Sequence, residues 1–236
     1  MRGLTGVITS FLLAVGIAAA GYFISQTMIN ARTGVNTASV KGLSERIVDA
    51  DTGRWTLTFK RAERDTNLVA ETFAALEQDK LRIQEVLTKA GFSAEEMRFA
   101  PMIKNNQEER DYEGNVVDRY YTVDSSVQIY TRSPDKIEPS RQPIFSLTTD
   151  GIQIRESSLS YDFTGLNEIK PDMLREATEN ARIAANEFAS NAGINVGGIQ
   201  LASQGGFSIQ SADDGSAGLR KLVRVVTNIT FYLDNK

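Results

Sequence analysis

The feature that most constrains this chain is an uncharged stretch near its N-terminus. No Asp, Glu, Lys or Arg occurs from Gly3 to Ala31, and Leu4–Ile29 is mostly apolar. A helix rises about 1.5 Å per residue, so roughly 20 apolar residues cross a hydrocarbon core of about 30 Å. The sequence therefore predicts a single transmembrane helix within residues 1–31. Its apolar anchor side chains are Leu4, Phe11, Leu12, Leu13, Val15, Ile17, Phe23, Ile24 and Ile29.

A cleaved signal peptide is the alternative interpretation of this segment. Arg2 precedes the apolar stretch, and the small residues Ala18 and Ala20 fit a cleavage site. Apolar side chains continue past that site to Ile29, however, where a cleaved protein would begin with polar residues. We therefore favour an uncleaved anchor. An anchor at this end of a chain usually exports the domain that follows, so we expect the rest of the protein outside the cytoplasm.

Composition excludes several classes of function. The chain has no histidine and no cysteine, which removes disulfides, thiol nucleophiles, His-based catalysis and the usual zinc ligands. Its net charge is −4, and the region after residue 32 is more acidic still, because residues 1–32 contain arginines and no acids. Nucleic-acid binding calls for a basic surface. We expect no metal, no cofactor and no nucleic-acid partner.

The first half of the globular region alternates strand and helix patterns. Residues 37–48 form a predicted strand, and Trp55, Leu57 and Phe59 alternate with polar residues in a second strand over 54–60. Spacings of three, four and seven between apolar residues predict a helix over 67–90, closed by Gly91. Two further strands, 98–111 and 116–131, flank a turn at 112–115 and indicate a hairpin.

The second half follows the same logic. Ser133-Pro134 begins a short helix, 152–162 is a strand, and Pro171 begins a long helix that ends near Asn191. Strands are predicted over 199–210 and 219–234. The fold class is therefore α+β, with antiparallel sheets and helices packed on one face, as one domain over 37–236 after a linker over 32–36. The predicted buried face of the long helix is Leu174, Ala177, Ala181, Ala184, Phe188 and Ala192.

Several short motifs occur in an order that is typical of one protein family. They are Val40-Lys41-Gly42, Asp51 before the Trp55 strand, Gly91, Tyr120-Tyr121, Leu174-Arg175-Glu176-Ala177, Asn180-Ala181-Arg182, Ala184-Ala185, Phe188-Ala189, Gly193 and Val196-Gly197. On these residues the chain resembles the SIMPL-domain proteins from about Ser39 to Tyr232. This is a bacterial envelope family catalogued as a domain of unknown function.

The resemblance implies a single-pass protein of the bacterial inner membrane, with its globular domain in the periplasm or outside the cell. It also implies a link to stress defence and, by likeness to some members, ring or channel-like homo-oligomers. No catalytic residues carry over, because the family has none established. Our first hypothesis is a membrane-anchored, non-enzymatic protein that binds membrane lipid through its helix and self-assembles. The expected contact within 105–125 is formed by Tyr112, Asn115, Tyr120 and Tyr121.

Two alternatives remain open. One is a periplasmic module that binds a small ligand or peptide through the tyrosine-rich hairpin. The other is a carboxylate-based envelope hydrolase, which needs two acids about 5–9.5 Å apart. No spacing in the sequence singles out a pair among the candidates Glu45, Asp51, Glu156 and Asp162.

Overall fold

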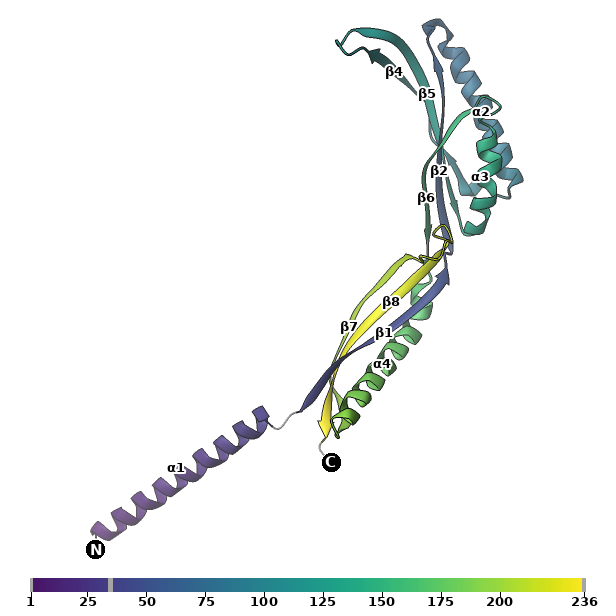
Figure 1. Cartoon of the computed structure of the whole chain (residues 1–236). Coiled ribbons are helices and arrows are strands. Elements are labelled where there is room, and N and C mark those ends of the chain that lie inside the picture. Colours follow the sequence, from purple (N-terminus) through teal and green to yellow (C-terminus); the bar gives the residue numbers. More distant parts are fainter. Residues whose placement is uncertain (1, 34–35, 235–236) are drawn as a thin grey trace. The chain divides into compact units, whose positions relative to one another are not determined.

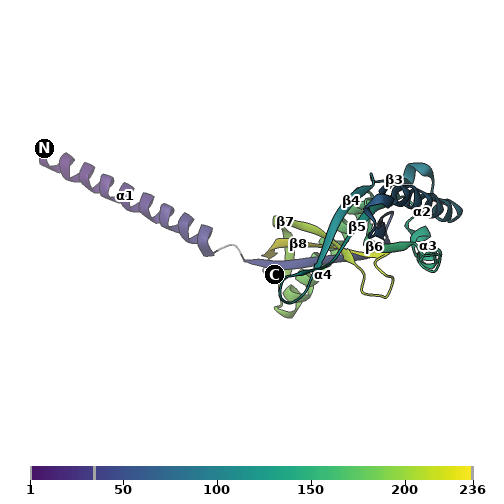
Figure 2. The same cartoon turned by 90° about the horizontal axis from the view of Figure 1, so that it is seen from above.

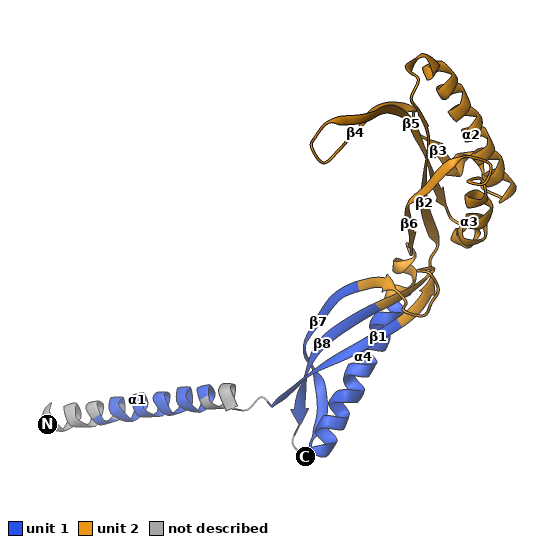
Figure 3. Cartoon of the chain, turned by 45° about the horizontal axis from the view of Figure 1, so that its top comes forward, with its two compact units in different colours: residues 1–45, 171–207, 224–236 blue, residues 46–170, 208–223 orange. Residues whose placement is uncertain are grey.

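The computed structural model describes residues 2–33 and 36–234, and the side chains of residues 11, 13–28 and 36–234. The chain forms two compact units (Figure 3). Unit 1 comprises residues 1–45, 171–207 and 224–236, and unit 2 comprises residues 46–170 and 208–223. Each unit combines an antiparallel sheet with helices (Figure 1), which confirms the predicted α+β class.

The N-terminal segment is one helix, α1 (Arg2–Thr33). Its described anchor residues are all exposed: Phe11, Leu13, Val15, Ile17, Phe23 and Ile24. The side chains of Leu4, Leu12 and Ile29 lie outside the described residues. Helix α1 continues through Thr33, into the expected linker over 32–36, and residues 34–35 are not described.

Within the part of the chain that the structure describes, no helix has the length and apolar character needed to cross a membrane.

Unit 2 is built on a five-stranded sheet with the strand order β3-β5-β2-β6, in which β4 also pairs with β5. Its neighbouring strands pair antiparallel. The strands are β2 (Thr52–Glu63), β3 (Met97–Phe99), β4 (Ile103–Arg110), β5 (Val116–Thr131) and β6 (Gln153–Asp162).

Helices cover one face of this sheet (Figure 1). They are α2 (Val69–Lys89) and α3 (Ile137–Ser146), with the 3-10 turns η1 (Thr66–Leu68), η2 (Ala94–Glu96) and η3 (Pro134–Lys136). Asp65 caps the first turn by accepting the Asn67 N–H, and Gly91 ends α2 at a φ of +92°. The C-terminal end follows the predicted signal, Gly91.

The core of unit 2 lies between the sheet and these helices. Trp55, Leu57 and Phe59 of β2 are fully buried, as the alternation predicted. They pack in one cluster with residues of β5, α2 and α3, including Val123, Val127, Ile129, Leu76, Ile83, Leu87, Ile137 and Ile144. The face of the sheet that carries these apolar side chains is covered by the helices, and the opposite face is left uncovered by them.

Unit 1 contains most of a three-stranded sheet of order β1-β8-β7, packed against one helix (Figures 1 and 2). Its elements are β1 (Thr37–Asp49), α4 (Leu166–Asn191), β7 (Asn195–Ser211) and β8 (Arg220–Asp234). Ala181 and Ala185 of α4 pack on Ile229 and Phe231 of β8. Small residues on the helix allow this close approach to the sheet.

The structure corrects the predicted start and the predicted face of the long helix. Pro171 lies inside α4, which begins at Leu166, with Glu168 placed favourably in the first turn. The buried row is Met173, Ala177, Ala181, Ala185 and Ala189. Of the six predicted positions, Ala177 and Ala181 are in that row, whereas Phe188 is 59% exposed.

The predicted strand over 98–111 is also wrong as a single element. It is divided into β3 and β4 by Ala100-Pro101-Met102. Proline has no N–H and cannot continue a hydrogen-bonded ladder. Both pieces nevertheless pair with the same strand, β5, so the predicted hairpin is confirmed.

Candidate functional site

The β4–β5 hairpin extends beyond the rest of its sheet. Strand β2 ends at Glu63, which lies opposite Tyr121, whereas β4 continues to pair with β5 as far as Val116. We call residues 107–120 the hairpin arm. Within the arm, β5 pairs with β4 and, among the described residues, with no other strand. The backbone N–H and C=O groups on the other edge of β5 are therefore left for another partner.

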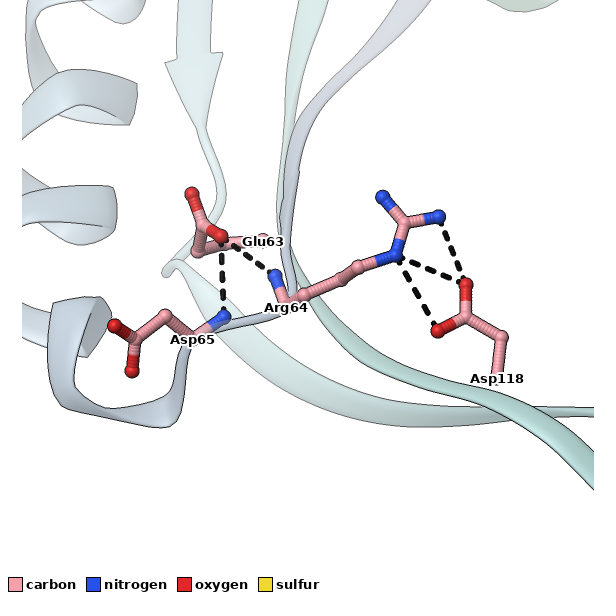
Figure 4. Close-up of polar contacts among 4 residues, drawn as sticks. All are labelled: Glu63, Arg64, Asp65 and Asp118. Atoms are coloured by element: carbon pink, nitrogen blue, oxygen red, sulfur yellow. Dashed lines mark hydrogen bonds and ion pairs between the residues drawn. The ribbon is translucent and has the colours of Figure 1, made fainter.

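The base of the arm is held by an ion pair with the end of β2 (Figure 4). Arg64 Nη2 and Asp118 Oδ2 are 2.8 Å apart, and Arg64 Nε donates to the same carboxylate. The hydrogen bond from Arg64 lowers the pKa of the Asp118 carboxyl. Glu63 Oε1 accepts the backbone N–H groups of Arg64 and Asp65, which orders the turn after β2.

The tip of the arm is ordered by one carboxylate. Asp111 accepts the backbone N–H groups of Glu113 and Asn115 and the Asn115 side-chain amide. These bonds, led by the Asn115 side chain, lower the pKa of Asp111. Gly114 takes a φ of +89°, which suits a tight turn. The tip therefore presents Tyr112, which is fully exposed, from a fixed backbone.

The predicted contact residues are divided between surface and core. Tyr112 and Asn115 are exposed and Tyr120 is half-buried. Tyr121 is 1% exposed, and its hydroxyl bonds Thr72 and the Asp65 carbonyl. Because it points to the covered face of the sheet, Tyr121 is a core residue and is removed from the predicted surface.

Charge distinguishes the arm from an ordinary apolar contact. It carries five acids and two arginines. Glu108 is paired with both arginines, at 2.8 Å from Arg110 and 3.1 Å from Arg119. The surplus of carboxylates means that two arms would repel each other if laid side by side.

The open face of the sheet has two adjoining cavities. They have volumes of about 430 and 460 Å³ and share Lys60 and Gln153 as lining residues. Asp124 lines the first, and its Oδ1 atom is buried without a hydrogen-bond partner. Tyr120 lines the second, at the base of the arm. The lining of the two cavities includes both positive and negative side chains, such as Lys60 and Asp124.

Of the four acids considered for hydrolysis, three have structural partners for their carboxylates, namely Glu45, Asp51 and Glu156. Glu45 belongs to unit 1 and lies 3.5 Å from Arg224. In unit 2, the Asp51 carboxylate accepts the N–H groups of Thr164 and Gly165. Asp162 uses its carbonyl to accept from Asp51 N and Thr52 Oγ1.

The fourth acid, Glu156, belongs to a polar network under α3 that the sequence did not reveal. It accepts from Trp55 Nε1 at 2.9 Å and pairs with Arg141. Arg141 also pairs with Glu138, which accepts from the Tyr161 hydroxyl at 2.9 Å. Burial, and then the bond to Glu138, raises the pKa of Tyr161 above its usual value. The network fastens α3 to β2 and β6.

A second feature missed from sequence is an ion pair across the core of unit 2. Arg61 donates to both oxygens of Asp79, at 2.6 and 2.7 Å. Asp79 is 3% exposed and lies on the buried face of α2 between Leu76 and Ile83. Its spacing in the apolar stripe was the available signal. The neighbouring Lys80 pairs with Glu77.

Acidic side chains do not gather into a metal centre in the described part of the chain: no group of three or more could hold an ion.

Comparison with known families addresses the resemblance directly. The model of the family SIMPL, described as "Protein of unknown function (DUF541)", matches residues 38–221. The chain belongs to the SIMPL family. This confirms the resemblance inferred from the motifs, and the SIMPL match extends through both units. No curated protein matches this SIMPL chain. The description of the family names no enzymatic activity.

Proposed function

We propose that this SIMPL protein is a membrane-anchored, extracytoplasmic and non-enzymatic protein that works as a homo-oligomer in envelope stress defence. The observation that carries the proposal is the hairpin arm. It extends past β2, leaves backbone groups of β5 without a strand partner, and ends in the fully exposed Tyr112. The resemblance to SIMPL proteins implies the link to stress defence, and the structural partners of the Glu45, Asp51 and Glu156 carboxylates favour a role without catalysis.

The anchor is supported by sequence and by exposure. Leu4–Ile29 is uncharged, and the described apolar side chains of α1, such as Phe23 and Ile24, are exposed. A bilayer would bury these side chains. A tether would also concentrate copies in one plane, which favours even weak contacts between them.

The anchor gives the first expected result. The full-length protein should remain in the membrane fraction after carbonate washing, because its helix spans the bilayer. Intact-mass measurement should return the uncleaved chain. Release by carbonate, or a mature chain that begins at Gly21, would contradict the anchor and favour export by signal peptide.

The acidity of the arm determines the kind of assembly. Because two arms repel each other, an arm must contact a different surface on its neighbour. Such head-to-tail contacts generate rings or open filaments. Copies anchored in one membrane must all face the same way, and a closed ring meets that condition. The proposed assembly is therefore a ring with its anchors on one side.

Light scattering of the full-length protein in mild detergent tests this assembly. We expect a mass of more than two copies for the wild type. The variant Tyr112→Asp/Val117→Asp should have a lower mass, because it adds charge at two exposed apolar positions of the arm. Leu81→Asp is the matched control, since Leu81 is 48% exposed on α2, and it should keep the wild-type mass. A monomeric wild type over a tenfold concentration range would overturn self-assembly.

A second candidate function is binding of a small polar ligand or peptide on the open sheet face. The two cavities that share Lys60 and Gln153 favour it, as does the unpartnered Asp124 Oδ1. Opposite charges around one groove suit a ligand with both an ammonium and a carboxylate group. A monomeric mass in the experiment above would make this the better-supported function.

A further inference from the structure

Strand β7 forms an edge of its sheet and lacks three of the usual protections of an edge strand, namely charge, proline and shortness. It has 17 residues and lies at one end of the order β1-β8-β7. No charged residue and no proline occurs between Asn195 and Ser211, although 24% of the chain is charged. Natural edge strands are commonly kept apart by charge, proline, bulges or shortness. Strand β7 has neither charge nor proline and is not short.

The other edges of the described sheets are protected. Strand β1, at the opposite edge, contains Lys41 and Glu45, and β6 contains Arg155. The arm carries its surplus of acids. Only β7, among the edges in the described residues, combines neutrality with exposed apolar side chains. Ile199 is 47% exposed and Leu201 is 65% exposed.

We propose that β7 pairs with β7 of a second copy, antiparallel and about a twofold axis, so that two sheets become continuous. The inference rests on the self-assembly proposed above and adds a contact separate from the arm. The occupant is another copy because a twofold contact places the same surface on both sides. A charged strand paired with its own copy would place like charges opposite each other, which is destabilising. Strand β7 has no charged residue, so its pairing with a copy has no such cost.

Two contacts of different symmetry make different predictions for mass. The arm contact is head-to-tail and builds a ring, whereas the β7 contact is twofold and pairs copies. Loss of the β7 contact should therefore release single rings, whose mass is lower than that of the wild-type assembly. Loss of the arm contact should leave pairs held by β7.

The test is light scattering of full-length Ile199→Lys/Leu201→Lys in mild detergent. We expect a mass below that of the wild type with unchanged circular dichroism, because lysine protects an edge strand against pairing. Phe188→Lys is the matched control, being 59% exposed on α4 of the same unit, and it should keep the full mass. An unchanged mass for the β7 variant, beside an assembled wild type, would overturn the β7 contact and leave the arm-based assembly standing. A monomeric wild type would overturn both.

A cross-linking experiment tests the same contact without disturbing the fold. The natural chain has no cysteine, so single cysteines report unambiguously. Leu201 and Ser203 lie near the middle of β7 and are exposed. The single variants Leu201→Cys and Ser203→Cys should therefore each form a disulfide-linked dimer under mild oxidation. Ser190→Cys on the exposed side of α4 should not. Absence of dimer from both β7 cysteines would also contradict the proposal.

Discussion

Replacing Gly42 by alanine should destabilise unit 1 by about 3 kcal/mol, the upper end of the usual cost of overpacking a core. Gly42 is buried in β1, and a Cβ placed there would lie 1.8 Å from the Ala177 carbonyl oxygen and 2.8 Å from Ala181 Cβ. The first of these atoms is backbone, so α4 itself must move. Urea unfolding followed by circular dichroism measures the loss.

Gly198→Ala is the matched control for this prediction. It lies in β7 of the same unit, and a Cβ there would meet nothing within 4 Å. We expect its free energy of unfolding to stay within about 0.5 kcal/mol of the wild type. Equal stability for the Gly42 and Gly198 variants would contradict the close approach of β1 to α4.

The Arg61→Leu variant should lose about 3 kcal/mol of unfolding free energy, because it leaves the carboxylate of Asp79 buried without its partner. Asp79 is 3% exposed, whereas the Arg61 side chain is 39% exposed, which places the cost at the low end for buried pairs. Arg61→Leu/Asp79→Leu should regain most of that loss, since apolar side chains can replace a buried ion pair.

Arg64→Leu serves as the control for the ion pair. Its pairing with Asp118 is a surface contact, with 76% of the Arg64 side chain exposed, so its removal should cost no more than about 1 kcal/mol. If Arg61→Leu and Arg64→Leu unfold at the same urea concentration, the buried pair contributes nothing special to unit 2.

Local patterns in the sequence predicted the elements of unit 2 because each pattern reports on one face. Alternation placed Trp55 and Phe59 in the core, and Gly91 marked the end of α2. The Arg61–Asp79 ion pair was not predicted from the sequence, for a physical reason. A carboxylate in an apolar stripe is stable only if a cation on another element reaches it, and the pattern within one helix does not show that cation.

The late helix shows the same limit in another form. The predicted buried face was centred on the two large apolar residues Leu174 and Phe188. The structure selects the row of alanines instead, because Gly42 brings the sheet against Ala177 and Ala181. The distance between two elements, which decides whether large or small side chains are buried, is a tertiary property.

The hairpin was predicted in location, and the exposure of its side chains only in part. The turn at 112–115 indicated the arm, and Tyr112 and Asn115 are exposed as a contact requires. The direction of Tyr121 depended on the pairing of β5 with β2 and β4 together. The unprotected edge of β7 was visible in the sequence as a run without charge, but its position at the edge required the strand order.

The strand order β1-β8-β7 has a consequence for biosynthesis. The central strand of this sheet, β8, is the last of the three to leave the ribosome, so β1 and β7 have no neighbour until residues 220–234 are made. The sheet of unit 2, by contrast, is complete at Asp162. Because domains generally fold as units during synthesis, the sheet of unit 2 can form while the chain is still being extended, and residues 208–223 join that unit later. The sheet of unit 1 must wait for its final strand, and until then β7 is an unpaired strand without charge.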